Sequence, residues 1–229
     1  MQILAISLDL DDTLWPVEPA ILQAERCLDE WLREHHPHVA TKWPIVAMRE
    51  LRDTISRERV DLAHDFTAQR LLTLERAFAA CGVGNEHVDA AFDIYYAARN
   101  RVDFYADTLP ALATLSARLP LISVSNGNAD LARMGLRHYF RDCISARDLG
   151  VAKPAAAIFH AACERLGVPG ECVLHVGDDP LLDVAAARGA GLRSAWLNRS
   201  GGAWSDGPAP DLEIRDLGEL AEWVLARTD

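Results

Sequence analysis

The chain has 229 residues, of which 50% are hydrophobic, and a formal net charge of −11 at pH 7. This length and composition suit a globular protein with one large domain or two modest ones. The negative charge argues against binding nucleic acid or an anionic membrane surface, which requires a basic face. No segment has the roughly 18 uninterrupted apolar residues that a membrane span requires. We therefore expect neither nucleic acid nor membrane as a partner.

The chain begins with a short apolar run, residues 3–8, which predicts a buried parallel strand. Asp9 and Asp11 follow this run directly. In an open α/β sheet, ligands bind in the crevice outside the carboxyl ends of the strands. Two acids separated by one residue suggest divided roles, in which one carboxylate attacks and binds metal while the other handles a proton.

The next ninety or so residues have a helical pattern. Apolar residues recur at helical spacing, and nothing between residues 16 and 103 has the pattern of a strand. Pro37, Pro44 and the Gly82 to Gly84 turn separate the helices. Residues 16–103 are therefore predicted to form an inserted helical bundle. The predicted helices cover residues 20–36, 45–60, 66–81 and 88–99.

From residue 103 onward, strands and helices alternate. The predicted strands are 121–125, 143–145, 172–176 and 193–197, and the predicted helices are 110–119, 130–139, 155–166, 180–189 and 217–227. A Gly- and Pro-rich surface loop over 200–210 precedes the last helix. This alternation predicts an α/β fold with a Rossmann-like, doubly wound parallel sheet. Residues 1–15 and 104–229 would form this core.

Four polar clusters end or follow the predicted strands. Each one alone has an ordinary explanation as a helix cap, a turn or a solvated side chain. In a parallel sheet, however, the strand ends meet at one crevice, so the four clusters are expected to converge. The clusters are Asp9/Asp11/Thr13, Ser125/Asn126/Gly127, Lys153/Pro154 and Asp178/Asp179/Asp183.

These clusters, in this order, resemble the motifs of the haloacid dehalogenase superfamily. DLDDT at 9–13 is similar to the first motif, DxDxT, and SNG at 125–127 to the Ser/Thr motif. KP at 153–154 is similar to the lysine motif, and GDDPLLD at 177–183 to the acidic fourth motif. The chain thus resembles the magnesium-dependent phosphatases of this superfamily, with the helical insertion in the place of a C1-type cap.

The resemblance implies a role for each residue of the first motif. Asp9 would be the nucleophile that forms an aspartyl-phosphate, and a ligand of Mg²⁺. Asp11 would be the general acid and base, and its backbone carbonyl would also bind the metal. Thr13 would hold Asp11 through a side-chain hydrogen bond.

The other three motifs would bind the phosphoryl group and complete the metal site. Ser125, the backbone amides of Asn126 and Gly127, and Lys153 would hold the phosphoryl oxygens. The three acids of the fourth motif have separate implied roles. Asp178 would be a further Mg²⁺ ligand, Asp183 would orient Lys153 or a metal-bound water, and Asp179 would lie behind the site or cap the following helix.

The expected function is Mg²⁺-dependent hydrolysis of a small phosphorylated metabolite. A phosphomutase would retain all four motifs, whereas a 2-haloacid dehalogenase of the same fold would have another residue in place of Asp11 and no metal site. A phospho-Asp receiver fits the insertion and the length poorly, and an inactive scaffold conflicts with four chemically competent motifs. The similarity extends to phosphatases of sugar phosphates, nucleotides and flavin-pathway intermediates, without favouring one.

The cysteines, the histidines and Trp15 are not part of the four motifs, and the sequence gives a separate expectation for each. Five cysteines without CxxC spacing are expected to be reduced and mostly buried, as in a cytoplasmic protein without a targeting peptide. The sequence is compatible with a monomer or a homodimer. His35, His36 and His38 lack a second group of ligands for a metal site. We expect His175 to be a packed strand residue, and Trp15 either to contact substrate or to serve as a hinge or packing residue.

Overall fold

The computed structural model describes residues 2–204 and 207–228. Residues 205 and 206 of the predicted loop lie outside the described residues. Contacts between Cα atoms divide the chain into two compact units. One contains residues 1–16, 103–127 and 131–229, and the other contains residues 17–102 and 128–130.

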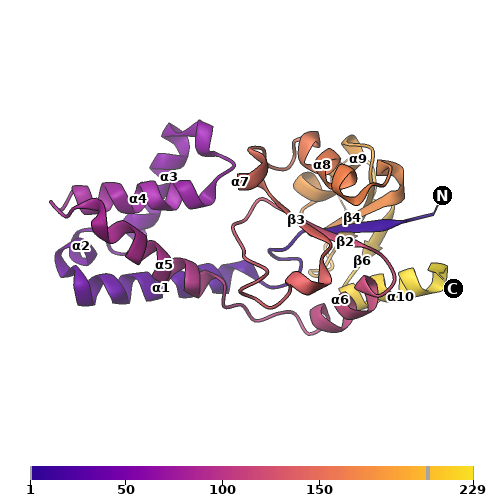
Figure 1. Cartoon of the computed structure of the whole chain (residues 1–229), viewed down its shortest axis with the longest axis horizontal. Helices are drawn as coiled ribbons and strands as arrows, with labels where there is room; N and C mark the ends of the chain where they lie inside the picture. Colours follow the sequence, from indigo (N-terminus) through magenta and orange to yellow (C-terminus); the bar gives the residue numbers. More distant parts are fainter. Residues whose placement is uncertain (1, 205–206, 229) are drawn as a thin grey trace. The chain divides into compact units, whose positions relative to one another are not determined.

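The larger unit is built on a six-stranded parallel sheet with the strand order β3-β2-β1-β4-β5-β6 (Figure 1). The chain enters in the middle at β1, runs outward through β2 and β3, and then returns to the other side of β1 at β4. The switch point therefore lies between β1 and β4, where such folds bind ligands. The strands are β1 (Ala5–Leu8), β2 (Leu121–Ser125), β3 (Asp142–Ser145), β4 (Val173–Gly177), β5 (Arg193–Leu197) and β6 (Leu212–Ile214).

Helices cover both faces of this sheet. In Figure 1, α8 (Ala156–Leu166) and α9 (Ala186–Gly189) lie on one face, and α6 (Thr108–Ser116) and α10 (Leu217–Thr228) lie on the other. Side chains of β1 to β4 pack against Ile158 and Phe159 of α8 in one apolar core. The predicted α/β class, with a helical insertion after the first strand, is thus confirmed. The short elements are α7 (Ala146–Leu149), η3 (Arg137–Tyr139), η4 (Gly170–Cys172) and the π-helical η5 (Pro180–Ala185).

The smaller unit is a bundle of helices. Its longest helix, α1, buries Ala20, Ala24, Leu28 and Leu32, which lie four residues apart and form one stripe. This stripe joins a core with residues of α4 and α5, among them Phe78. The elements are α1 (Val17–His35), α2 (Pro37–Lys42), α3 (Ile45–Glu58), η1 (Val60–Leu62), α4 (Phe66–Ala79), η2 (Asn85–His87) and α5 (Val88–Arg99).

Three features of the fold differ from the sequence predictions. The helix predicted over 130–139 is wrong: these residues form turns and the short η3, with Gly135 at a φ of 76°, which a helix does not accommodate. Pro37 separates two helices as predicted, but it also opens α2, a helix that was not predicted; at this position its missing N–H removes no helical hydrogen bond. Strand β6 has three residues and was too short for its alternation to be recognised.

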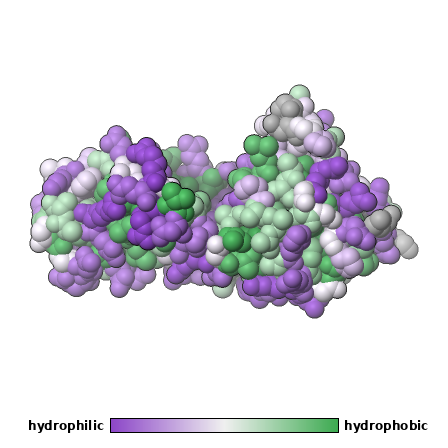
Figure 2. Space-filling model, turned by 90° about the horizontal axis from the view of Figure 1, so that it is seen from above, coloured by the Kyte–Doolittle hydropathy of each residue, from purple (hydrophilic) through white to green (hydrophobic). Residues whose placement is uncertain are grey.

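The surfaces of the two units are mixed. Figure 2 shows that the visible face of each unit carries hydrophilic residues interspersed with hydrophobic ones. None of the helices in the described part combines the length and hydropathy needed to cross a bilayer. All five cysteines are free thiols, and each is half-buried, in contrast to the mostly buried cysteines that we expected.

Candidate active site

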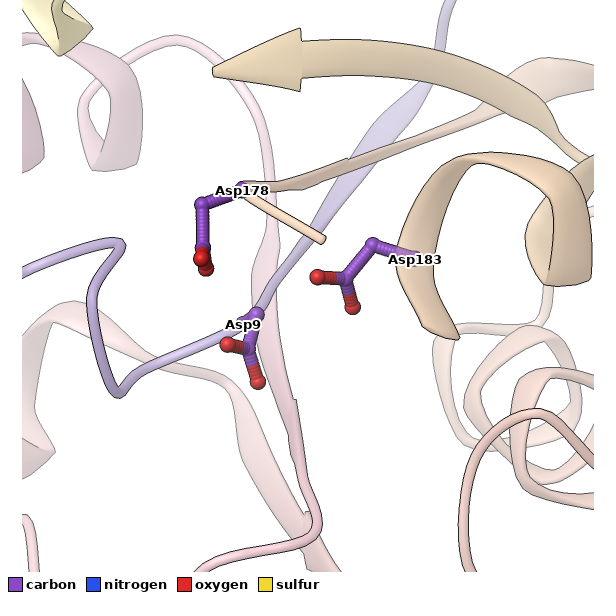
Figure 3. A group of neighbouring side chains, drawn as sticks. All are labelled: Asp9, Asp178 and Asp183. Atoms are coloured by element: carbon purple, nitrogen blue, oxygen red, sulfur yellow. The ribbon is translucent and has the colours of Figure 1, made fainter. Parts of the chain in front are cut away.

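Three carboxylates converge at the carboxyl ends of the two central strands. Asp9 follows β1, Asp178 follows β4, and Asp183 lies in η5 (Figure 3). One ligand atom from each lies within 4.8 Å of the other two, and among the described residues this is the group suited to a metal ion. Carboxylate oxygens are the ligands that Mg²⁺ prefers. The residues present therefore fit this ion.

Lys153 lies against two of these carboxylates. Its Nζ donates to Oδ1 of Asp9 and to Oδ1 of Asp183, both at 2.6 Å, and the lysine is 5% exposed. Burial alone would lower the pKa of Lys153, but the charges of Asp183 and Asp9 outweigh it and raise this pKa. The ammonium therefore stays charged beside the candidate nucleophile.

The three carboxyl groups differ in proton affinity. Burial raises the pKa of Asp9, and Lys153 opposes this rise. Burial also favours the neutral form of Asp183, yet Lys153 and His175 together hold its pKa below the usual range. Burial, with the charge of Asp183 next in size, raises the pKa of Asp178 to about 7. Without a cation, the Asp178 carboxyl therefore takes up a proton near neutral pH.

Asp11 is held apart from this cluster. Its Oδ1 accepts a hydrogen bond of 2.9 Å from Nε1 of Trp15, whose side chain is fully buried. A Cβ on Gly127 would overlap Oδ2 of Asp11, so the absence of a side chain at Gly127 leaves the space that this oxygen uses. The candidate acid and base therefore has its own partners, as expected if the two acids have different roles.

The Trp15 hydrogen bond can be tested by substitution. We expect Trp15→Phe to lower kcat by up to about tenfold, because one hydrogen bond contributes about 0.5–1.5 kcal/mol and this one holds the candidate proton donor. Steady-state kinetics and thermal unfolding of the variant would measure this. Trp223→Phe is the matched control, since that ring lies in α10 beneath Arg227. A Trp15→Phe enzyme with unchanged kcat would contradict the assignment.

Hydrogen bonds connect the loop after β2 to the backbone of Lys153. Asn126 Nδ2 donates to the carbonyl oxygen of Lys153 (2.9 Å), and the Lys153 N–H donates to Asn126 Oδ1 (2.7 Å). The amide of Gly127 donates to Ser125 Oγ (3.0 Å). Because the Asn126 side chain fixes the segment that carries Lys153, two of the predicted clusters are held together. We had expected only the backbone amide of Asn126 to take part.

Two sequence expectations change with the structure. The Thr13 hydroxyl donates to Oδ1 of Asp178 (3.1 Å), whereas we expected it to hold Asp11. The positions of these loops in space decide this choice, and the sequence order does not show them. Of the two roles left open for Asp179, the structure shows helix capping: its Oδ1 accepts from the N–H groups of Leu181 and Leu182, at 2.7 and 2.8 Å.

Sequence reasoning missed several partners of the site. His175 Nε2 lies 3.1 Å from Asp183 Oδ1, and Trp196 Nε1 donates to the backbone oxygen of Asp178 at 2.9 Å. A polar residue within an apolar buried strand was the available signal for His175. No local pattern marked Trp196. His36 contacts the rings of Phe78 and His87, and neither it nor its histidine neighbours belong to the metal-suited group found among the described residues.

The chain is similar to several known proteins. The sequence profile of the family described as haloacid dehalogenase-like hydrolase matches residues 3–191. The 5-amino-6-(5-phospho-D-ribitylamino)uracil phosphatase YigB of Escherichia coli (strain K12) is 32% identical over 231 residues, covering 97% of each chain. A crystal structure of a 2-haloacid dehalogenase from Pseudomonas syringae pv. Tomato DC3000 is 36% identical, with a TM-score of 0.92 and 99% of each chain covered. An (S)-2-haloacid dehalogenase of Pseudomonas putida is 33% identical over 132 residues, covering 55% of this chain and 58% of its own.

Proposed function

Since the chain belongs to the haloacid dehalogenase-like hydrolases, we propose that it is a Mg²⁺-dependent phosphatase that hydrolyses a small phosphorylated metabolite. The observation that carries this proposal is the group of Asp9, Asp178 and Asp183 beside a buried Lys153. Three carboxylates close together provide the negative charge that favours a divalent cation, and Asp9 and Asp178 would provide oxygen ligands for it. A haloacid carries no phosphoryl charge that such a cation would neutralise.

Asp9 and Asp178 would hold the metal through their carboxylates, together with the backbone carbonyl of Asp11. When bound, Mg²⁺ supplies positive charge that offsets the charge of the phosphoryl oxygens. Lys153 adds a second positive charge beside Asp9. Ser125 and the amides that follow it would bind the remaining phosphoryl oxygens. Phosphoryl transfer needs mainly such positioning and charge neutralisation.

The chemistry runs in two steps. A carboxylate oxygen of Asp9 attacks the phosphorus, the ester P–O bond breaks, and Asp11 gives its proton to the departing alkoxide. The result is an aspartyl-phosphate and a free alcohol. Asp11 then takes a proton from water, whose oxygen attacks the phosphorus and releases inorganic phosphate from Asp9. Both carboxyl groups end in their starting protonation states.

A 2-haloacid dehalogenase is the second candidate, because the solved structure with a TM-score of 0.92 carries that description. In that reaction the carboxylate of Asp9 would displace a halide from carbon. Such a displacement uses neither a proton donor for the leaving group nor a cation. The presence of Asp11 and of the three-carboxylate group therefore favours the phosphatase.

One experiment separates the two. The purified protein is assayed for phosphate release from p-nitrophenyl phosphate and for halide release from 2-chloropropionate, each with Mg²⁺ and with EDTA. We expect phosphate release that needs Mg²⁺, and no halide release. Halide release that is insensitive to EDTA would establish the dehalogenase instead. Transfer of the phosphoryl group to a second hydroxyl, without release of phosphate, would indicate a mutase.

For the substrate, we propose a phosphorylated sugar or sugar alcohol. The support is the YigB relative, whose name describes a phosphoribitylamino compound and which aligns over almost the whole chain. A panel of ribityl, sugar, nucleotide and amino-acid phosphates, compared by kcat/KM, would test this. A preference for phosphoserine or for nucleotides would contradict it.

Metal affinity should depend on pH through Asp178. The pKa of this carboxyl is about 7, so below that pH it is protonated and must lose a proton to bind Mg²⁺. We expect the Kd for Mg²⁺ to rise by up to about tenfold per pH unit below 7. Calorimetric titration with Mg²⁺ at pH 6 and pH 8 measures this. Equal affinity at both values would contradict the assignment, and Asp178→Asn should weaken the pH dependence, with the part due to Asp9 remaining.

A further inference from the structure

A chain of buried polar side chains runs from the sheet to the candidate nucleophile. Ser7 and His175 are paired in register across β1 and β4, and both are at most 1% exposed. Ser7 Oγ lies 2.7 Å from His175 Nδ1, and His175 Nε2 lies 3.1 Å from Asp183 Oδ1. The ring also packs edge-on against Phe159, with centroids 5.0 Å apart. Neither Ser7 nor His175 has a role in the chemistry described above.

The contacts define which nitrogen carries the proton. Burial lowers the pKa of His175, although Asp183 opposes this, so the ring is neutral. An ionised carboxylate only accepts hydrogen bonds, so Nε2 must carry the proton that faces Asp183. Nδ1 then accepts from the Ser7 hydroxyl. Ser7 therefore selects the tautomer that donates to Asp183.

Asp183 is held on every side by donors. Its Oδ1 accepts from His175 Nε2 and from Lys153 Nζ, and its Oδ2 accepts from the N–H of Asp179 at 3.1 Å. A Cβ on Gly177 would overlap the carboxyl group, so the backbone there also leaves the space for it. The same Lys153 Nζ contacts Asp9. A change in the orientation of Asp183 is therefore passed to the ammonium beside the nucleophile.

We propose that His175 is a positioning residue, which orients Asp183 and through it sets the place of the Lys153 ammonium against Asp9, with Ser7 fixing the ring. Without the His175 donor, Asp183 relies more on Lys153 and draws the ammonium away from Asp9. The phosphoryl group in the transition state then receives less of this positive charge. The effect on catalysis rests on the proposed phosphatase function, whereas the effect on Lys153 does not.

A direct measurement uses the small number of lysines. The sequence contains two lysines, Lys42 and Lys153, and Lys42 is exposed in the helical unit. Protein labelled with ¹⁵N at the lysine Nζ therefore gives two side-chain signals, one of which is an internal control. We expect His175→Leu and Ser7→Ala to shift the Lys153 signal and to leave that of Lys42 in place. An unchanged Lys153 signal in both variants would overturn the proposal, whatever the activity.

Kinetics then test the consequence for the reaction. With saturating Mg²⁺, we expect His175→Leu to lower kcat by about 10- to 100-fold with little change in KM. This is the size of effect typical of residues that orient the side chains of a site by hydrogen bonds. His175→Gln, which keeps an N–H donor, should recover most of this loss. Ser7→Ala should lower kcat by about 2- to 10-fold, and the double variant should be no slower than His175→Leu alone.

The outcomes separate three explanations. If the variants lose stability to urea but keep wild-type kcat, His175 is a packing residue and the proposal fails. If His175→Gln is as slow as His175→Leu, the N–H donor is not what matters, and the proposal also fails. If the wild-type protein releases no phosphate, the proposed function fails, and the Lys153 signal alone decides the role of His175. Ser7→Ala removes a single oxygen atom, so it keeps the test available if His175→Leu does not fold.

Discussion

Asp9→Asn should lower phosphatase turnover by about 10⁴-fold or more, because an amide at this position cannot form the acyl phosphate. The fold should persist, since Lys153 keeps its ion pair with Asp183 and one buried charge is removed. Steady-state phosphate release, together with urea unfolding, measures both effects. The expected result is an inactive protein with a free energy of unfolding close to that of the wild type.

Two comparisons make the result specific to Asp9. Asp53→Asn changes an exposed acid that is paired with Arg52 on α3, and should keep full activity. Asp11→Asn should leave the first step intact for p-nitrophenyl phosphate, whose leaving group needs no proton, and slow the second step. A phosphorylated Asp9 should then accumulate and be detectable by mass spectrometry. Retention of activity within tenfold in Asp9→Asn would rule out Asp9 as the nucleophile.

Lys153→Met should produce the largest loss of stability among these variants. It leaves two buried carboxylates, Asp9 and Asp183, without their shared cation, and removing one partner of a buried ion pair costs about 3–5 kcal/mol. In the wild type, Lys153 contributes to holding the pKa of Asp183 low. The ionised Asp183 therefore stabilises the fold at pH values above the pKa that Asp183 has in the unfolded chain, and this contribution is lost in acid. Without Lys153 the carboxyl pKa values rise, so the variant should become more stable as the pH falls from 8 to 5.

Urea unfolding at these two pH values, with and without Mg²⁺, measures the effect. Mg²⁺ should restore part of the lost stability, because a ligand that binds the folded state stabilises it by mass action. Lys42→Met is the matched control, since the Lys42 ammonium is exposed and donates to the backbone oxygen of Ala80. If Lys153→Met costs no more than Lys42→Met at pH 8, the carboxylates do not depend on the Lys153 charge as the geometry implies.

The fold was largely predictable because its signals are local. Strands of four to five mostly apolar residues at β1, β2, β4 and β5 alternate with amphipathic segments, and this alternation is typical of a parallel α/β sheet. The failures arose where a local pattern was weak or interrupted. The apolar residues over 130–139 suggested a helix, but Gly135 in the left-handed region turns the chain there. The three residues of β6 gave too few positions for a pattern.

The sequence predicted which residues lie at the candidate site, but not the contacts between them. Asp9, Lys153 and Asp183 follow from the order of motifs along the chain, and the structure brings both carboxylates within hydrogen-bonding distance of Lys153. The partners of these residues did not follow. We expected Thr13 to hold Asp11 and the structure pairs it with Asp178; we expected His175 to pack within its strand, and it also contacts Asp183.

The sequence alone therefore predicted the sheet, the helical insertion, and the acids and the lysine that follow the strands. It did so because strand and helix periodicity is local, and because parallel strands present their carboxyl ends at one edge. The pairing of donors with acceptors depends on how the strands and loops pack in space. Ser7 and His175 are 168 residues apart in sequence and 2.7 Å apart in space, and hydrogen bonds require distances that only the packing of the whole sheet defines.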